Sequence, residues 1–575
     1  MNRPQVGTHA RAHTRTHTHT QGSCCGPALW NVLYNALLNL DFSSHTKVIA
    51  FADDLAIMSQ GKTPTEAEAY ANSDLARIEK WAKENKLRFN ETKSKAMLIT
   101  RHRSNVTINV YLNNRRLDQV TEMKYLGIYF DRRLTFDKHI ENIAEKSTTM
   151  THMLGKSAKL HWGLGHKSLK IIYEGALIPL LTYGAPVWEE AAGKLRNLRK
   201  LQRVQRLMTI KITKAYRTIS YDASCVMAGV PPIAIVIAEK AQLYKSKHCM
   251  EGAAFEYDMP VPVTDWPHPA RRANIMETSD SISYATEIYT DGSKIGGKVG
   301  AGMAIYTDKT LVRQWKYKLQ DCCSNNQAEQ IAILKSLELL PTLDGHNPRT
   351  VSIYTDSKVT LAALKNYSIH SFLIEGIRNM VRHLTLLDWT IHFGWVKAHA
   401  GIEGNERADT LAKEAAQDED EQNIVYNRMP TTTAATELKK EGVIKWQRQW
   451  ERTAKGALCR SFFPTVEQRL KVKLPITPEF TAMVTGHGKT KSYLHRFKLT
   501  ECPMCPCNEG AQTPEHLIYA CKILEIQRSS LKQNITAGGG TWPPTNSELV
   551  AKHLNAFSRF IKSIDFNELQ LIVGL

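Results

Sequence analysis

Residues 286–293 read Thr-Glu-Ile-Tyr-Thr-Asp-Gly-Ser, and this stretch decides the fold of the best-defined part of the chain. We expect a strand here that ends on the carboxylate of Asp291. Gly292 permits a tight turn at that point. The segments 299–307 and 311–319 are expected to be two more strands. We therefore expect a three-strand meander as the start of a mixed α/β domain.

Four carboxylates lie where the predicted elements of this domain begin or end. Asp291 and Asp356 end strands, Glu329 lies in the first turns of a helix after Ser324, and Asp409 lies on a later helix. If the sheet gathers them, their charges repel one another unless cations intervene. Mg²⁺ and Mn²⁺ are hard cations that prefer oxygen ligands, and two such ions can clamp a phosphodiester. A single strand-end Asp is more often a turn residue, so the prediction depends on the whole set.

Five separated motifs contain these acids. They are Tyr289-Thr-Asp-Gly-Ser293, Asn325-Asn-Gln-Ala-Glu329, Tyr354-Thr-Asp-Ser357, Val396-Lys-Ala-His-Ala-Gly401 and Gly404-Asn-Glu-Arg-Ala-Asp409. Their order and their strand and helix context resemble the ribonuclease H family.

The resemblance implies a ribonuclease H-like domain over residues 283–418 that cuts the RNA strand of RNA–DNA hybrids. Metal binding would fall to Asp291, Glu329, Asp356 and Asp409, with two Mg²⁺ or Mn²⁺ ions. Hybrid contacts would come from Asn325, Asn326 and Gln327. His399 precedes Asp409 by ten residues on a glycine-bearing loop, where it can relay protons to the leaving group.

Composition indicates an intracellular nucleic-acid-binding protein of several domains. The 575 residues include 75 Lys and Arg against 56 Asp and Glu, a net charge of +19. This excess favours a polyanionic partner, nucleic acid first. We expect no membrane anchor and no secretion, because no run of about 18 apolar residues and no apolar leader is present. The nucleus or the cytoplasm is the expected location, and no protein partner is indicated.

The N-terminal half carries a second carboxylate pair, Asp53 and Asp54, between two β-like runs, which predicts a hairpin with both acids at its tip. Around it lie Gln21-Gly-Ser-Cys-Cys-Gly-Pro27, Leu87-Arg-Phe-Asn-Glu-Thr-Lys-Ser94, Lys124-Tyr-Leu-Gly-Ile128 and Leu181-Thr-Tyr-Gly-Ala-Pro-Val-Trp188. This series resembles reverse transcriptases of non-LTR, insect type-1-like retrotransposons. It implies a palm over residues 21–135, a helical thumb over 136–257 and retrotransposon RNA as a partner.

One departure limits the polymerase expectation. Residues 1–20 form a His- and Thr-rich tract, with His9, His13, His17 and His19, and contain no acid. We expect this tract to be a tail without fixed structure. The polymerases that the chain resembles need a further aspartate upstream, so we interpret the chain as a C-terminal part of such a Pol protein with a truncated palm. Two alternatives stay open: an inactive nucleic-acid-binding relic, and a polymerase that takes its missing aspartate from another chain.

The remaining segments are predicted from composition. Residues 258–282 are rich in Pro, which predicts a linker. We expect residues 419–493 to form a linker and a helical segment. Residues 194–217 predict a basic helix with an apolar stripe of Leu195, Leu198, Leu201, Val204 and Leu207. Its cations fit a solvated face and a phosphate-contacting face equally well.

A cysteine cluster marks the C-terminal segment, residues 494–575. Cys502, Cys505, His516 and Cys521 offer four ligands for a closed tetrahedral Zn²⁺ site. Cys507 can replace one of the thiolates. The alternative is a loop of reduced cysteines without metal.

Overall fold

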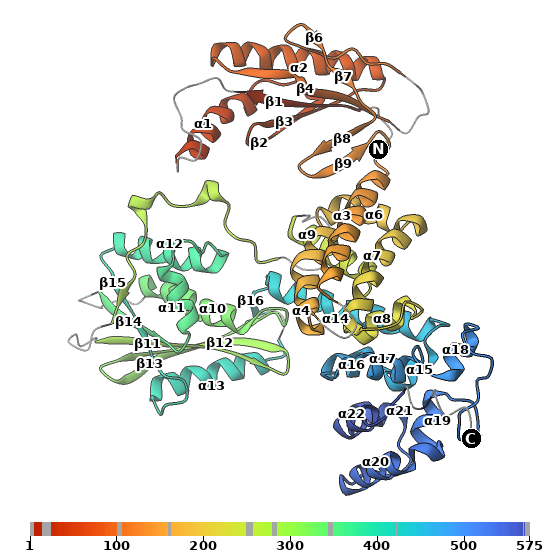
Figure 1. Ribbon diagram of the computed structural model, residues 1–575. Coiled ribbons are helices and arrows are strands. Elements are labelled where there is room, and N and C mark those ends of the chain that lie inside the picture. Colours follow the sequence, from red (N-terminus) through yellow and green to blue (C-terminus); the bar gives the residue numbers. More distant parts are fainter. Residues whose placement is uncertain are drawn as a thin grey trace. The chain divides into compact units, whose positions relative to one another are not determined.

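The computed structural model of the protein describes residues 5–13, 25–100, 106–158, 163–248, 257–278, 285–342, 349–420, 423–566 and 569. The chain forms two compact units (Figure 1). Met1–Ala238 and Lys445–Leu575 make up the first unit, and Glu239–Ile444 make up the second.

The first unit begins with a five-stranded sheet in the order β2-β3-β1-β4-β7. The elements of this part of the chain are β1 (Gln5–His13), α1 (Gly26–Leu38), β2 (Thr46–Phe51), β3 (Asp54–Gln60), α2 (Pro64–Glu84), β4 (Arg88–Ile99), β5 (Tyr111–Leu112), β6 (Arg115–Arg116), β7 (Asp118–Gln119), β8 (Glu122–Tyr125) and β9 (Ile128–Asp131). Strands β5 and β6, and strands β8 and β9, form two separate two-stranded sheets. Helix α2 starts at the N-cap Thr63 with Pro64 in its first turn, as its sequence favours. Its buried face, which includes Leu75 and Ile78, belongs to the core of this sheet.

The prediction of a tail without structure is wrong for Gln5–His13. This segment is strand β1, paired antiparallel with β3 on one side and with β4 on the other. The biased composition gave no sign of a strand. It is nevertheless compatible with one, because the hydrogen bonds of a β-ladder join backbone groups, and small and larger polar residues can alternate along it. Residues 21–24 of the stretch Gln21–Pro27 lie outside the described residues, while Cys25 precedes helix α1.

A helical bundle follows this sheet in the first unit. Its helices are α3 (Asp137–Lys156), α4 (His166–Ile172), η1 (Tyr173–Leu177), α5 (Ile178–Leu181), α6 (Ala185–Ala192), α7 (Leu195–Thr213), α8 (Tyr221–Ala228) and the start of α9 (Ile233–His248), whose residues from Glu239 on belong to the second unit. Helix α7 buries Leu201, Val204 and Met208, whereas Leu195 is 61% exposed. The predicted stripe therefore begins too early, since the helix turns its first leucine to solvent.

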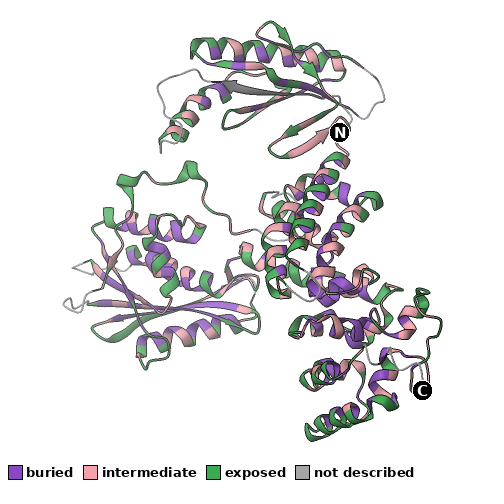
Figure 2. Cartoon of the chain, viewed as in Figure 1, coloured by how far each residue is buried: buried purple, intermediate pink, exposed green. Residues whose placement is uncertain are grey.

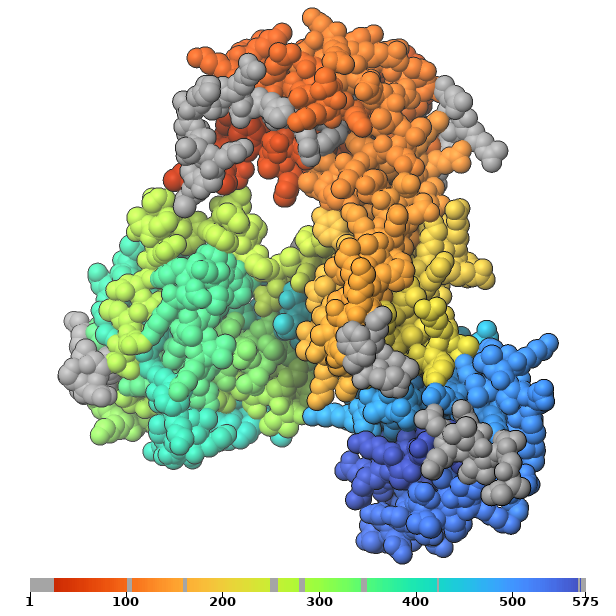
Figure 3. Space-filling view, viewed as in Figure 1, coloured from red at the N-terminus to blue at the C-terminus, as the bar shows by residue number. Residues whose placement is uncertain are grey.

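The C-terminal helices pack on this bundle. They are α14 (Thr431–Arg452), α15 (Ala457–Phe462), α16 (Val466–Lys471), α17 (Pro478–Thr485), α18 (Lys491–Arg496), α19 (Pro514–Tyr519), α20 (Glu525–Ala537), α21 (Asn546–Ala551) and α22 (Leu554–Lys562). The Thr481 hydroxyl donates to the Thr213 carbonyl at 2.6 Å, and the Thr218 hydroxyl meets that of Tyr493 at 2.7 Å. Residues 445–493 are thus part of a compact unit rather than a linker, and Figure 3 shows these segments in blue against yellow.

The second unit is a seven-stranded mixed sheet in the order β10-β15-β14-β11-β12-β13-β16. Its elements are β10 (Met276–Glu277), β11 (Thr286–Ile295), β12 (Lys298–Thr307), β13 (Thr310–Leu319), α10 (Asn325–Leu339), β14 (Thr350–Thr355), α11 (Lys358–Lys365), α12 (Phe372–Leu386), β15 (Thr390–Trp395), α13 (Glu403–Gln417) and β16 (Ile424–Tyr426). The predicted meander is confirmed as β11, β12 and β13, which pair antiparallel. Figure 2 shows β11 and β12 buried along most of their length.

The expected linker over 258–282 is wrong for its described residues, because they pack on the second unit. Trp266 stacks on His370 with ring centroids 3.5 Å apart, and the Val261 N–H donates to the His370 carbonyl. Strand β10 then covers the edge strand β15, as β16 covers β13 at the other edge. Proline suits the segment 258–278 because most of it forms no β-ladder, so that the missing N–H of proline is not needed. The two short strands β10 and β16 protect the edges of the sheet, which would otherwise be open.

Among the described residues, no single helix is long and apolar enough to cross a membrane. One bent pair, Tyr221–Ala228 with Ile233–His248, passes that test by length and composition.

Candidate active site

Parallel pairing of two central strands brings the first two acids together. Thr290 of β11 pairs with Thr355 of β14, and the pairing ends there, so Asp291 and Asp356 are the next residue on each strand. Strand β11 continues to Ile295, so the predicted turn at Gly292 is wrong. Gly292 is required for another reason: a Cβ there would lie 2.5 Å from the Glu329 backbone nitrogen. The glycine allows α10 to deliver Glu329 beside Asp291.

Helix α13 brings the fourth acid by lying unusually close to the sheet. A Cβ on Gly300 or Gly302 of β12 would collide with the backbone of α13, which faces the strand with small residues such as Ala408 and Ala412. Two glycines opposite alanines therefore set the depth at which Asp409 sits.

Three of the four acids form one group, in which Asp291 and Glu329 are buried and Asp356 is half-buried. Oxygens of Asp291, Glu329 and Asp356 all lie within 4.8 Å of one another. Asp291 and Glu329 are only 5% and 4% exposed. Burial, and then the charges of neighbouring acids, raises the pKa of Asp291 to about 8 and that of Glu329 to about 9. Burial also raises the pKa of Asp356. The group therefore holds protons at neutral pH when no cation is bound.

Asp409 lies next to this group but is held by a cation of the protein itself. The Lys413 ammonium donates to its Oδ2 at 2.6 Å, and the carboxylate raises the pKa of that lysine. Asp409 is close enough to raise the pKa of both Asp291 and Asp356. The sequence prediction missed Lys413, although its position one turn after Asp409 is the spacing at which helical ion pairs form.

His399 stands at the mouth of the site. It is 74% exposed, adopts a left-handed backbone (φ 51°), and its Nδ1 lies 3.9 Å from Asp409 Oδ2. The Glu406 carboxylate accepts from the Gly401 N–H at 3.1 Å and so ties the far side of the loop to α13. An exposed imidazole on a tethered loop can reach a substrate that the buried acids hold.

Trp395 is a second residue that the sequence analysis did not single out. Its indole N–H donates to the Asp356 carbonyl at 3.1 Å, which supports the backbone of that acid. Its ring is 45% exposed, and the Lys358 ammonium lies 3.8 Å from the ring centroid. An exposed aromatic ring and a cation thus flank the acids.

Two family models match separate parts of the chain. Residues 283–417 match the family model for RNase H, and residues 5–130 match that for reverse transcriptase (RNA-dependent DNA polymerase). The chain is 30% identical over 211 residues to a retrovirus-related Pol polyprotein from type-1 retrotransposable element R1 4 of Nasonia vitripennis, covering 34% of this chain and 53% of that protein. The chain is a relative of type-1 retrotransposon Pol proteins.

A second curated protein and a solved structure also match parts of the chain. A putative 115 kDa protein in type-1 retrotransposable element R1DM of Drosophila melanogaster is 27% identical over 203 residues, which cover 35% of this chain and 20% of that protein. The chain thus spans about half or less of the length of these relatives. The crystal structure of RNase H1 from Halobacterium salinarum aligns at 24% identity with 23% of this chain and 96% of that chain, with a TM-score of 0.19.

The predicted hybrid-contacting residues of the RNase H domain divide into two groups. Asn325 and Asn326 are exposed in the first turn of α10. Gln327 is 4% exposed instead, because it closes a capping box with Ser324 and donates to Asp258 Oδ2 at 2.7 Å. Its amide is used inside the fold, and its contact with a hybrid stays a prediction.

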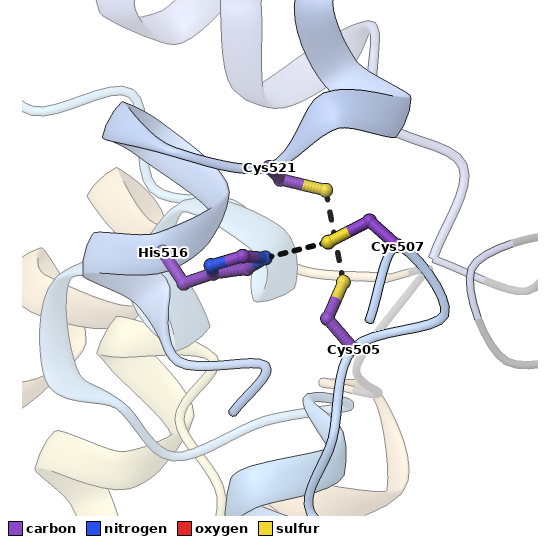
Figure 4. A group of neighbouring side chains, drawn as sticks. All are labelled: Cys505, Cys507, His516 and Cys521. Atoms are coloured by element: carbon purple, nitrogen blue, oxygen red, sulfur yellow. Dashed lines mark hydrogen bonds between the residues drawn. The ribbon is translucent and has the colours of Figure 1, made fainter. Parts of the chain in front are cut away.

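The chain also has a Cys/His cluster, in which Cys507 stands where Cys502 was predicted (Figure 4). One atom each of Cys505, Cys507, His516 and Cys521 lies within 4.8 Å of the others. Cys507 Sγ is 3.2 Å from His516 Nε2, and the sulfurs of Cys505 and Cys521 are 3.6 Å apart. Cys502 is exposed and its sulfur accepts from the Met504 N–H. The turn after Cys505 brings Cys507 inward, so the substitute thiolate takes the place of Cys502.

The reverse-transcriptase-like part places Asp53 and Asp54 at the β2–β3 hairpin, as predicted. Phe51 pairs with Asp54 across the turn, and Ala52 has a left-handed backbone (φ 51°). The neighbouring strand β1 brings Arg11 opposite Asp54 in the ladder, and the nine residues of β1 include no acid. Asp53 and Asp54 therefore have no carboxylate from this adjacent strand.

Proposed function

We propose that the RNase H domain hydrolyses the RNA strand of RNA–DNA hybrids by endonucleolytic cleavage, within a retrotransposon Pol protein. The observation that carries the proposal is the convergence of Asp291, Glu329 and Asp356 into one group. A merely structural role gives no reason to gather three acids at this distance, because without a cation they must either keep protons or repel one another at a cost in folding free energy.

The donor set fits divalent cations. All members offer carboxylate oxygens, and among the described residues the Glu329 Oε2 atom is buried without a hydrogen-bond partner. Asp291, Glu329, Asp356 and Asp409 would hold two Mg²⁺ or Mn²⁺ ions. Bound ions of this kind supply Lewis acidity for attack on a phosphodiester.

The side chains of the domain orient the substrate and move protons. His399 is exposed beside Asp409 and can donate a proton to the departing 3′ oxygen. Asn325 and Asn326 present amides at the surface beside Glu329, where they can hydrogen-bond to sugars of the hybrid. The 2′-hydroxyls of RNA offer hydrogen bonds that DNA lacks, so the hybrid is favoured over duplex DNA.

Cleavage of a labelled hybrid by the full chain with Mg²⁺ tests the proposal. Asp356→Asn should lower the rate by roughly a hundredfold or more, because it removes a charged ligand near the transition state. Asp308→Asn, the same change in the exposed β12–β13 turn, is the matched control and should keep full activity. Equal rates for the two variants, or equal cutting of duplex DNA, would contradict the proposal. Binding of the hybrid by the unaltered chain without any cleavage would favour the inactive nucleic-acid-binding alternative.

We also propose that the chain by itself does not extend a primer. Strand β1 supplies no acid next to Asp53 and Asp54, and two-metal polymerase chemistry needs a further carboxylate. Primer extension on an RNA template, above that of a variant with Asp53 and Asp54 both changed to Asn, would refute this. We place the protein in the nucleus or the cytoplasm, with retrotransposon RNA as a partner.

The Cys/His cluster supports one further proposal, a structural Zn²⁺ ion. Its ligands would be Cys505, Cys507, His516 and Cys521, three sulfurs and one imidazole, a combination typical of closed zinc sites.

A further inference from the structure

The C-terminal helices surround a cavity that neither the acids nor the Cys/His cluster uses. Its volume is about 900 Å³, within the ~300–1,000 Å³ typical of ligand sites. It lies inside the first unit, between the end of α16, the loop after α20 and the start of α22. Figure 1 shows α20, α21 and α22 as neighbours, and α22 packs against both other helices.

Four cationic side chains line this cavity from three separate segments: Lys471, Lys473, Lys552 and Arg559. Glu548 is the one acid among the described lining residues. It pairs with Lys552 at 2.9 Å, and Lys471 pairs with Glu467 at 2.7 Å. Because Glu548 and Glu467 each offset one lysine, the excess of positive charge comes from Lys473 and Arg559, and it attracts an anion to the cavity.

The backbone around the cavity also suits an anion. Gly538, Gly539 and Gly540 form the wall after α20, and a Cβ on Gly540 would lie 2.7 Å from His553 Nε2. Glycine therefore leaves the wall open where the imidazole approaches. Helix α22 begins at the cavity, and its N-cap, His553, gives no side-chain cap hydrogen bond. The first turn of that helix adds positive partial charge to the lysines and the arginine.

We infer that this cavity binds the phosphate backbone of a single-stranded nucleic acid. Lysine and arginine are the side chains that contact phosphates, and the cavity is larger than one phosphate group needs. A flexible single strand can bend successive phosphates into a hollow surface, whereas a rigid duplex offers its phosphates on a convex one. The site is separate in sequence and in chemistry from the acids of the RNase H domain, where negative charge dominates.

Fluorescence anisotropy of labelled single-stranded RNA and DNA oligonucleotides tests the inference. The full chain is used without Mg²⁺, so that no cleavage occurs. Lys473→Gln with Lys552→Gln should weaken single-strand binding about tenfold. The slope of the logarithm of the binding constant against the logarithm of the salt concentration should become shallower by about 1.4, which is ~0.7 for each of two lost phosphate contacts. Lys439→Gln with Lys440→Gln removes the same charge from the exposed face of α14 and should change the affinity less than twofold.

Two further measurements make the test decisive. Photocrosslinking of a 4-thiouridine oligonucleotide to the unaltered chain should label peptides within residues 466–475 or 534–560. This experiment does not depend on the folding of any variant. Inorganic phosphate and a mononucleotide should compete only at much higher concentration than the strand. Equal losses in both double variants, crosslinks confined to other segments, or equal affinity for duplex DNA would each overturn the inference.

Discussion

Single residues decide the charge state of the RNase H site. Asp291 and Glu329 are buried beside other acids, so the folded protein keeps protons that the unfolded chain releases. Lys413 supplies a permanent positive charge to Asp409, which is the one acid of the four outside the buried group. The metal-free site is therefore neutralised in two ways, by protons within the group and by an ammonium beside it.

The first prediction concerns pH without metal. The pKa values of Asp291 and Glu329 are raised, from 3.8 to about 8 and from 4.5 to about 9, so deprotonation costs folding free energy. The melting temperature of the metal-free domain should fall as pH rises from about 4 to about 9. Glu329→Gln should flatten this dependence, while Glu338→Gln, on the same helix, should leave it unchanged. A melting temperature that rises over this window would refute the assignment.

The second prediction concerns Lys413. A cation that binds Asp409 must displace the lysine, so Lys413→Met should bind Mn²⁺ more tightly in calorimetry. We expect about a fivefold gain, which matches the ~1 kcal/mol of a partly exposed ion pair. Lys335→Met breaks an ion pair of similar length, 2.7 Å, with Glu338 and should not change Mn²⁺ affinity. Weaker binding in Lys413→Met would instead show that the lysine supports the site.

Secondary-structure elements decide how the site is delivered and protected. The parallel β11–β14 pair delivers two acids, and the glycine-to-alanine contact between β12 and α13 sets the depth of a third. Strands β10 and β16, from segments outside residues 283–418, cover both edges of the sheet.

These edge strands yield the third prediction. A fragment of residues 283–418 lacks β10, β16, the Trp266–His370 stack and the Asp258–Gln327 hydrogen bond. A fragment of residues 257–430 keeps them all. If these contacts contribute about 3 kcal/mol, the shorter fragment should melt roughly 6–12 °C lower in calorimetry. Identical melting temperatures would mean that the flanking segments do not stabilise the domain.

At the scale of the whole molecule, the chain leaves its first unit after residue 238 and returns to it at residue 445. Contacts such as Thr481 to Thr213 join segments more than 250 residues apart. The Cys/His cluster belongs to this returning part, and Cys521 accepts through its carbonyl from Arg528 of α20. A metal in the cluster would therefore stabilise the C-terminal part of the first unit.

The fourth prediction separates the two possible ligand sets. The purified chain should contain one tightly held Zn²⁺, and Cys507→Ser should lose it because a thiolate of the cluster is removed. Cys502→Ser, the matched control on the exposed cysteine, should retain stoichiometric zinc by metal analysis. A chelator should lower the melting temperature of wild type but not of Cys507→Ser. Loss of zinc from Cys502→Ser alone would restore the ligand set that the spacing suggested.

The sequence by itself determined the features that depend on local pattern. Alternation predicted β11, β12 and β13, the adjacent acids predicted the hairpin at Asp53 and Asp54, and motif spacing identified the four acids. Tertiary structure decided which partners meet. It gathered three acids and paired the fourth with Lys413, it chose Cys507 over Cys502, and it made strands of Gln5–His13 and Met276–Glu277. The physical reason is that strand pairing, edge protection and ligand convergence join residues far apart in the chain, and no local periodicity records which distant backbone or side chain will be the partner.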